Sequence, residues 1–176
     1  MDGRGIRDSL RSKLIFVAVA ACAAVMPGRA FTQSEGGLYI AGYGFSFQEV
    51  ANRAIAQNPG SQRFFLLALP PETDALATTA PRAVATVRDM VTASNGILFV
   101  CQRDIDSGRV NAATLVPGVV AMRGWPPAGD DSMPLGERYF KGEDTTNLPA
   151  SNEALRRLRA TCSDPPAPSP RSRPSR

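Results

Sequence analysis

The sequence predicts an α/β protein, specifically a flavodoxin-like three-layer sandwich with a four- to five-stranded, mostly parallel sheet. Short apolar segments alternate along the chain with segments in which apolar residues recur every three or four positions. One segment, Phe64–Leu69 (FFLLAL), is apolar throughout, which is typical of a strand buried on both faces. The resulting order, β-α-β-α-β-α-β, favours parallel strands joined by right-handed crossovers, with helices on both faces.

The first strand is predicted at Leu38–Ala41, and Gly42-Tyr43-Gly44 follows it as a turn. A helix then begins, because Ser46 and Glu49 have the spacing of a capping box. Its inner face is formed by apolar residues three and four positions apart, namely Phe47, Val50, Ala51, Ala54 and Ile55. The helix is expected to end near Asn58-Pro59-Gly60.

Phe64–Leu69 is the second strand, and the next helix is predicted at Ala80–Ala93, with Asn95-Gly96 ending it. The third strand, Ile97–Cys101, is followed by a short helix from Asn111 through Leu115. Val119–Met122 is the fourth strand, and we expect the Gly-, Pro- and Asp-rich stretch Trp125–Pro149 to be irregular.

The last predicted helix is Asn152–Thr161, with Ser151 as its N-cap. Leu155 and Leu158 are expected to pack inward, while Arg156, Arg157 and Arg159 are expected to be solvated.

Residues 1–30 have the pattern of a secretory signal peptide. A basic leader precedes the apolar run Leu14–Met26, and the small residue Ala30 is the expected cleavage site. The alternatives are a lipidated Cys22 and a leader retained as a membrane anchor. We therefore expect a periplasmic or secreted protein that meets a membrane only through an uncleaved leader.

The charge of the expected mature chain is close to neutral. Residues 31–176 hold 15 Lys and Arg against 14 Asp and Glu, a net charge of +1. Residues 163–176 are rich in Pro, Ser and Arg and are predicted to be disordered. The folded α/β domain is therefore expected at residues 36–162, and its balanced charge argues against a nucleic-acid partner.

The cysteines and the absence of histidine limit the catalytic and metal sites that this chain can form. Cys101 and Cys162 remain after export, and such a pair in an oxidising compartment favours a disulfide. The chain has no histidine, which excludes His-bearing zinc sites, Ser-His-Asp triads and Cys-His dyads. No motif indicates a cofactor or a metal, and whether the protein is an enzyme stays open.

One block of the chain carries a family resemblance. Gly96, Cys101, the turn 107–110 (SGRV) and the segment 115–119 (LVPGV) follow one another as strand, cysteine, short helix and Pro-Gly before the next strand. Residues 38–124 thereby resemble the DsrE/DsrF-like (TusD-like sulfur-relay) family. The resemblance implies that Cys101 carries a persulfide, and that the protein forms a homo-oligomer or acts with a partner sulfur-transfer protein.

Cys101 is therefore the candidate catalytic residue, a sulfur carrier at the end of the third strand. Arg103 or Arg109 could lower the pKa of its thiol. A structural disulfide with Cys162 and an inert buried thiol are the alternatives, and the disulfide would leave a non-catalytic binding or assembly module.

Three other features have structural explanations that we prefer. The turn 42–44 could offer amides to an anion, but a tight turn that packs the helix on the sheet is favoured. The acidic residues lack the spacing of a calcium loop and are expected to be solvated; they are Asp104, Asp106, Asp130, Asp131, Glu143 and Asp144. Trp125, the only tryptophan, is expected to cover the end of the sheet.

Overall fold

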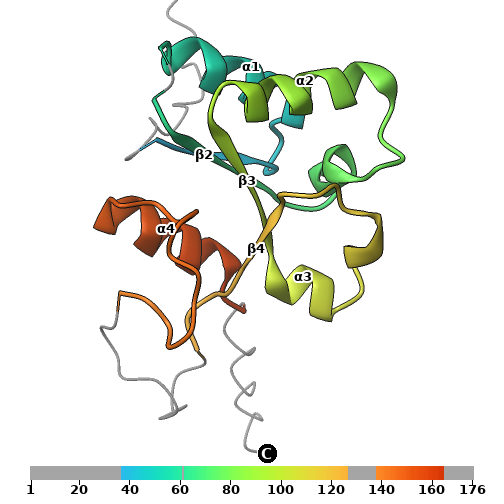
Figure 1. The fold of residues 1–176 in the computed structure, drawn as a ribbon. Coiled ribbons are helices and arrows are strands. Elements are labelled where there is room, and N and C mark those ends of the chain that lie inside the picture. The colour runs from blue at the N-terminus through green and yellow to red at the C-terminus, as the bar shows by residue number, and fades with distance from the viewer. Residues whose placement is uncertain (1–36, 61, 127–137, 165–176) are drawn as a thin grey trace, which may run out of the picture. The chain divides into compact units, whose positions relative to one another are not determined.

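The computed structural model describes residues 37–60, 62–126 and 138–164. Four parallel strands form one sheet: β1 (Leu38–Ala41), β2 (Phe64–Ala68), β3 (Gly96–Cys101) and β4 (Val120–Met122). With helices on both faces, this sheet confirms the predicted three-layer α/β class (Figure 1). The predicted signal peptide, and the tail from residue 165, lie outside the described residues.

The strands lie in the sheet in their chain order, β1-β2-β3-β4. A flavodoxin sheet has the order 2-1-3-4-5, in which the reversal of direction creates a crevice for a ligand. All three connections here step in the same direction, so the described sheet has no such reversal. When every right-handed crossover leads to the next strand in the same direction along the sheet, the connecting helices all lie on the same face of the sheet.

The first face of the sheet is covered by the crossover helices α1 (Phe47–Gln57) and α2 (Arg82–Ala93). A 3₁₀ helix, η1 (Glu72–Leu76), completes this layer. Successive side chains of a strand face opposite sides of the sheet, so every second strand residue points toward this helical layer. Leu66 and Val100 are examples.

The second face is covered by α4 (Asn152–Cys162), which follows β4 in the chain. Figure 1 shows α4 on the side of the sheet opposite to α1 and α2. Its inner residues Leu155 and Leu158 pack in one core cluster with strand residues such as Leu67 and Phe99. This layer therefore depends on a single described helix.

Both predicted helix caps are present. The Ser46 hydroxyl accepts a hydrogen bond from the Glu49 amide at 3.2 Å, and the Ser151 hydroxyl accepts one from the Ala154 amide at 3.4 Å.

Several boundaries differ from the prediction. Pro81 occupies the cap position of α2, so this helix begins at Arg82 instead of Ala80. The helix predicted at 111–115 is a 3₁₀ turn, η2 (Ala112–Thr114), capped by the Asn111 side chain. A short helix that we did not predict, α3 (Gln102–Asp106), begins directly after β3.

The prediction that Arg159 is solvated is wrong. Its side chain is fully buried, with 0% exposed. The guanidinium pairs with Glu143 at 2.5 Å and lies over the Phe140 ring, 3.8 Å from its centroid. These partners compensate the charge and make its burial tolerable.

None of the helices among the described residues combines the length and apolar character that a membrane span requires.

Candidate functional site

The candidate residue Cys101 forms a disulfide with Cys162. Their Cα atoms are 5.0 Å apart, although 61 positions separate them in the chain. Cys101 is 0% exposed and Cys162 is 2% exposed. The structure thus contains the pairing that the sequence left as one of three alternatives, and in this state Cys101 is not a free thiolate.

Local periodicity explains why the two sulfur atoms meet. Cys101 alternates with Val100 along β3 and therefore faces the second layer, together with Phe99. On α4, Leu158 and Cys162 are four positions apart and so lie on the same inner stripe. The disulfide therefore joins the carboxyl end of β3 to the last residue of α4.

Arg103 and Arg109 lie around Asp104, which is only 1% exposed. An Arg109 guanidinium nitrogen lies 2.5 Å from Asp104 Oδ1, and Arg103 Nε lies 3.7 Å from the same oxygen. Another Arg103 nitrogen donates a hydrogen bond to the backbone carbonyl of Ser163. Since a disulfide sulfur does not titrate, neither arginine has a thiolate to stabilise at Cys101 in this state.

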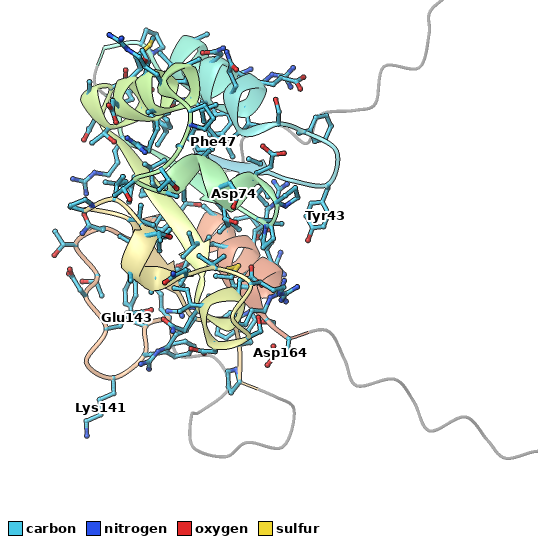
Figure 2. The ribbon with its side chains drawn as sticks, turned by 90° about the vertical axis from the view of Figure 1, so that its right-hand side faces the viewer. Tyr43, Phe47, Asp74, Lys141, Glu143 and Asp164 are labelled. Carbon is cyan, nitrogen blue, oxygen red and sulfur yellow. A yellow bond between two sulfur atoms is a disulfide. The ribbon has the colours of Figure 1, made fainter. Side chains whose placement is uncertain are left out.

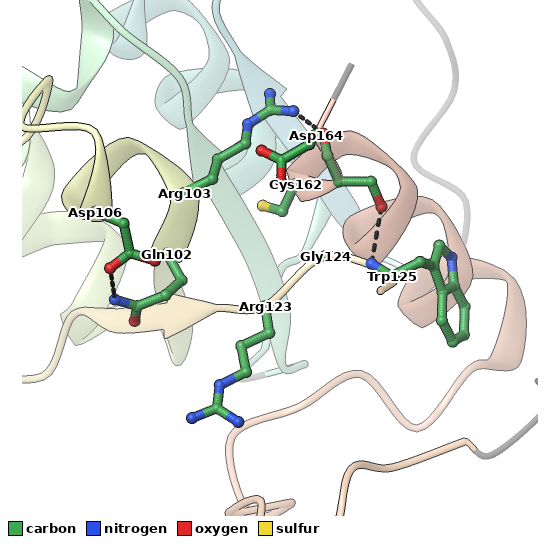
Figure 3. A pocket seen from close by; sticks show the side chains of 9 residues that line it. Gln102, Arg103, Asp106, Arg123, Gly124, Trp125, Cys162 and Asp164 are labelled. Carbon is green, nitrogen blue, oxygen red and sulfur yellow. Dashed lines mark hydrogen bonds between the residues drawn. The ribbon is translucent and has the colours of Figure 1, made fainter. Parts of the chain in front are cut away.

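A pocket of about 500 Å³ adjoins the disulfide, and Cys162 forms part of its wall. Figure 3 shows the residues that line it, which are Gln102, Arg103, Asp106, Arg123, Gly124, Trp125, Cys162, Ser163 and Asp164. They come from the short helix after β3, from the residues that follow β4 and from the end of α4. The pocket thus lies where these three chain segments meet.

The chain segments around this pocket approach each other closely. The Trp125 amide donates a hydrogen bond to the Ser163 hydroxyl at 2.8 Å. A Cβ atom placed on Gly124 would lie 2.4 Å from the backbone nitrogen and Cα of Ser163. Position 124 therefore requires glycine for a steric reason, since any side chain would push the end of α4 away from β4.

The turn 42–44 is tight, as the sequence favoured. Gly42 and Phe45 exchange two backbone hydrogen bonds, of 2.8 and 3.0 Å. The first amide of α1, that of Phe47, donates to the Glu72 carboxylate at 2.6 Å, so the protein's own side chain already binds there. Tyr43 is 75% exposed with a left-handed φ of 53° and projects away from the domain (Figure 2).

A second pocket, of about 510 Å³, lies between η1 and the segment after α3. Asp74 and Arg109 bring opposite charges to its wall, and Thr73 and Asn111 add polar groups. Asp74 is labelled in Figure 2. The side chains on the wall of this second pocket do not identify a ligand.

The prediction that the acidic residues are solvated is wrong for Asp104, which is 1% exposed and pairs with Arg109. Most of the others have partners within the protein as well. Glu143 pairs with Arg159, and Asp106 accepts a hydrogen bond from the side-chain amide of Gln102 at 2.8 Å. The Thr146 backbone amide donates to Asp144 at 2.9 Å, which lowers the pKa of that carboxyl. Asp130 and Asp131 lie outside the described residues. Within the described ranges, no three Cys, Asp or Glu side chains come together as metal ligands would.

Three contacts were missed in the sequence analysis, two of them at or near the site. Arg159 follows Leu155 by four positions, so helical periodicity alone places it on the inner stripe of α4; its charge led us to expect solvation. Trp125, expected to cover the sheet end, lines the pocket and has its ring centroid 5.6 Å from the Arg159 guanidinium. The role of Glu72 at the start of α1 had no signal in the sequence.

Comparisons with protein-family models, with curated proteins and with solved structures find no match for this chain. The resemblance of residues 38–124 to the DsrE/DsrF-like family therefore stays a prediction.

Proposed function

We propose that this chain is an exported, non-catalytic binding or assembly module in which the Cys101–Cys162 disulfide attaches α4 to the sheet. The observation that carries the proposal is the buried state of this disulfide, with 0% of Cys101 exposed. A sulfur carrier needs an accessible thiolate, whereas the Cys101 sulfur is bonded to Cys162 and Cys101 is buried.

A periplasmic or secreted location is part of the same proposal. The leader at residues 1–30 supports export, and disulfides persist in oxidising compartments outside the cytosol. The partner proposed for the module is a second copy of this chain.

The test combines self-association with sulfur uptake. Sedimentation velocity of the oxidised chain over a concentration series is expected to show reversible association, and mass spectrometry after treatment with a polysulfide is expected to show no added sulfur. The variant C101S/C162S should associate in the same way under conditions in which it is folded. A monomer at every concentration would contradict the assembly role.

A sulfur carrier acting through Cys101 is the second candidate. It is favoured by the position of Cys101 at the carboxyl end of β3, where open α/β sheets place their chemistry, and by the pocket beside the disulfide. The carrier would act only after reduction, with Arg103 and Arg109 stabilising the thiolate.

This candidate makes an opposite prediction for the reduced chain. Treatment with a polysulfide should add one sulfur atom to Cys101, and an acceptor thiol should remove it. The variant C101S should lose this transfer. If C101S still accepts and passes sulfur, the carrier role of Cys101 is wrong.

A further inference from the structure

We propose that the pocket at the end of α4 is a thiol-exchange site, at which a small dithiol reduces the disulfide of the folded protein by attacking Cys162. The two cysteines differ in their position relative to this pocket. Both cysteines are buried, but Cys162, 2% exposed, belongs to the wall of the pocket, whereas Cys101, 0% exposed, does not line it. This inference concerns a reaction of the disulfide and does not depend on the assembly role.

The direction of attack makes this difference in position decisive. A thiolate displaces one sulfur of a disulfide by approaching the other sulfur in line with the bond. Attack on Cys101 would require a path through the core between β3 and α4, where Phe99 and Leu158 pack. Attack on Cys162 can start from the pocket. In Figure 3 the Cys162 side chain lies among the lining residues, between those of Arg103 and Arg123.

The charges around the pocket define the class of reagent. Arg103 is already engaged with Asp104 and with the carbonyl of Ser163. Arg123 is exposed on the pocket wall. We infer that its guanidinium binds a carboxylate on the incoming dithiol. Asp106 and Asp164 also line the pocket, and their negative charges oppose an approaching thiolate. We infer that the positive charge of Arg123 favours a dithiol that carries a carboxylate over an uncharged dithiol.

The exchange proceeds in two steps that balance. The first thiolate of the reagent forms a bond to Cys162 Sγ, and the Cys162–Cys101 bond breaks, with its electron pair leaving on Cys101 Sγ, which takes a proton from water. The second thiolate of the reagent then attacks the reagent sulfur bound to Cys162 and releases Cys162 as a thiolate. The protein disulfide gains two electrons, and the dithiol becomes a cyclic disulfide.

Contacts other than the disulfide hold the end of α4 during this reaction. The Ser163 carbonyl accepts from Arg103, and its hydroxyl accepts from the Trp125 amide. Reduction is therefore expected to occur in the folded chain and to leave α4 in place long enough for the bond to form again.

The experiment measures reduction of the full oxidised chain, under native conditions, by dihydrolipoate and by uncharged dithiothreitol. Both rates should rise in proportion to the dithiol concentration. Arg123→Gln should slow dihydrolipoate about threefold, the size expected for one screened unit charge, and should slow dithiothreitol less. Asp164→Asn should accelerate both reagents about twofold for the same reason. Arg82→Gln, at the start of α2 and away from the pocket, is the matched control and should change neither rate.

Two results would overturn the proposal. A rate that does not depend on dithiol concentration would mean that reduction waits for unfolding. Rates for the Arg123 and Asp164 variants equal to that of Arg82→Gln would mean that the reagent does not enter this pocket.

A second measurement tests which sulfur is attacked. In C101S the remaining Cys162 should react with a dithionitrobenzoate probe about tenfold faster than Cys101 does in C162S, because access differs. The reverse order would overturn the assignment of Cys162. If circular dichroism shows that either variant fails to fold, the proposal is judged by the reduction rates of the disulfide-bonded chain and of its Arg123 and Asp164 variants.

Discussion

The two faces of the sheet are covered in different ways. On the first face, α1 and α2 lie within crossovers, so that a strand fixes each of them at both ends. On the second face, α4 follows the last strand and no described strand follows it. A sheet whose strands keep their chain order directs all its crossovers to one side, and its other side then depends on a terminal element.

The second face compensates with contacts that the first face does not need. The disulfide joins the last residue of α4 to the end of β3. Arg159, also on α4, reaches Glu143 and the backbone carbonyls of Arg123 and Arg138. Side-chain chemistry thus provides for α4 the restraint that chain connectivity provides for α1 and α2.

The largest expected effect comes from removing the disulfide. The variant C101S/C162S should lose about 4 kcal/mol in free energy of unfolding, as the chain-entropy model gives for a loop of some 60 residues. Hydrogen exchange should show the loss first in the amides of α4, while those of α1 and α2 stay protected. Urea unfolding, followed with and without a reductant, provides the measurement.

The wild-type chain under reducing conditions is the control, and it should match the variant. Equal loss of protection in all three helices would contradict the comparison, because it would mean that the two layers unfold as one unit.

The next largest effect is expected at Arg159. Arg159→Met should cost about 3 kcal/mol, because it leaves the largely buried Glu143 carboxylate without its cation. The double variant with Glu143→Gln should recover part of that loss. The matched control is Arg156→Met on the same helix, whose ion pair with Glu153 is exposed and contributes little. Similar costs for the two Met variants in urea unfolding would show that burial of Arg159 does not matter.

Sequence periodicity predicted those parts of the fold that local rules determine. The uniform apolar run of β2 and the two serine caps need only their own neighbours, so these predictions agree with the structure. The strand order could not be predicted in the same way, since the same apolar strands suit a sequential or a reversed order. The five residues of α3 are too few to show a helical period.

The candidate site was predictable in part. The position of Cys101 at the end of a strand follows from sequence, and so does the list of alternatives for its sulfur. Whether Arg103 and Arg109 would approach that sulfur depends on Asp104, whose burial arises from packing that no local pattern encodes. The pocket depends on Gly124 and Ser163, which meet only in the folded chain.

A smaller effect is expected at Gly124, where the residues that follow β4 contact those that follow α4. Gly124→Ala should cost about 2 kcal/mol, a typical penalty for overpacking, because the new methyl group meets the backbone of Ser163. In C101S/C162S only non-covalent contacts hold the end of α4, so it can shift more easily and the same substitution should cost less. A double-mutant cycle by urea unfolding measures this coupling. Additive costs would mean that the disulfide does not hold α4 against β4.

The smallest effect concerns the outer side of α4. Arg156 donates hydrogen bonds to Glu153, and this interaction lowers the pKa of the Glu153 carboxyl. A carboxyl whose pKa is lower in the folded state stabilises the protein above its unfolded pKa and loses that contribution as the pH falls through the folded pKa. Glu153→Gln should therefore reduce the acid sensitivity of the melting temperature slightly, and added salt should remove the difference. A change that salt does not screen would place Glu153 among the contacts that hold α4 to the sheet, because only a buried interaction escapes screening.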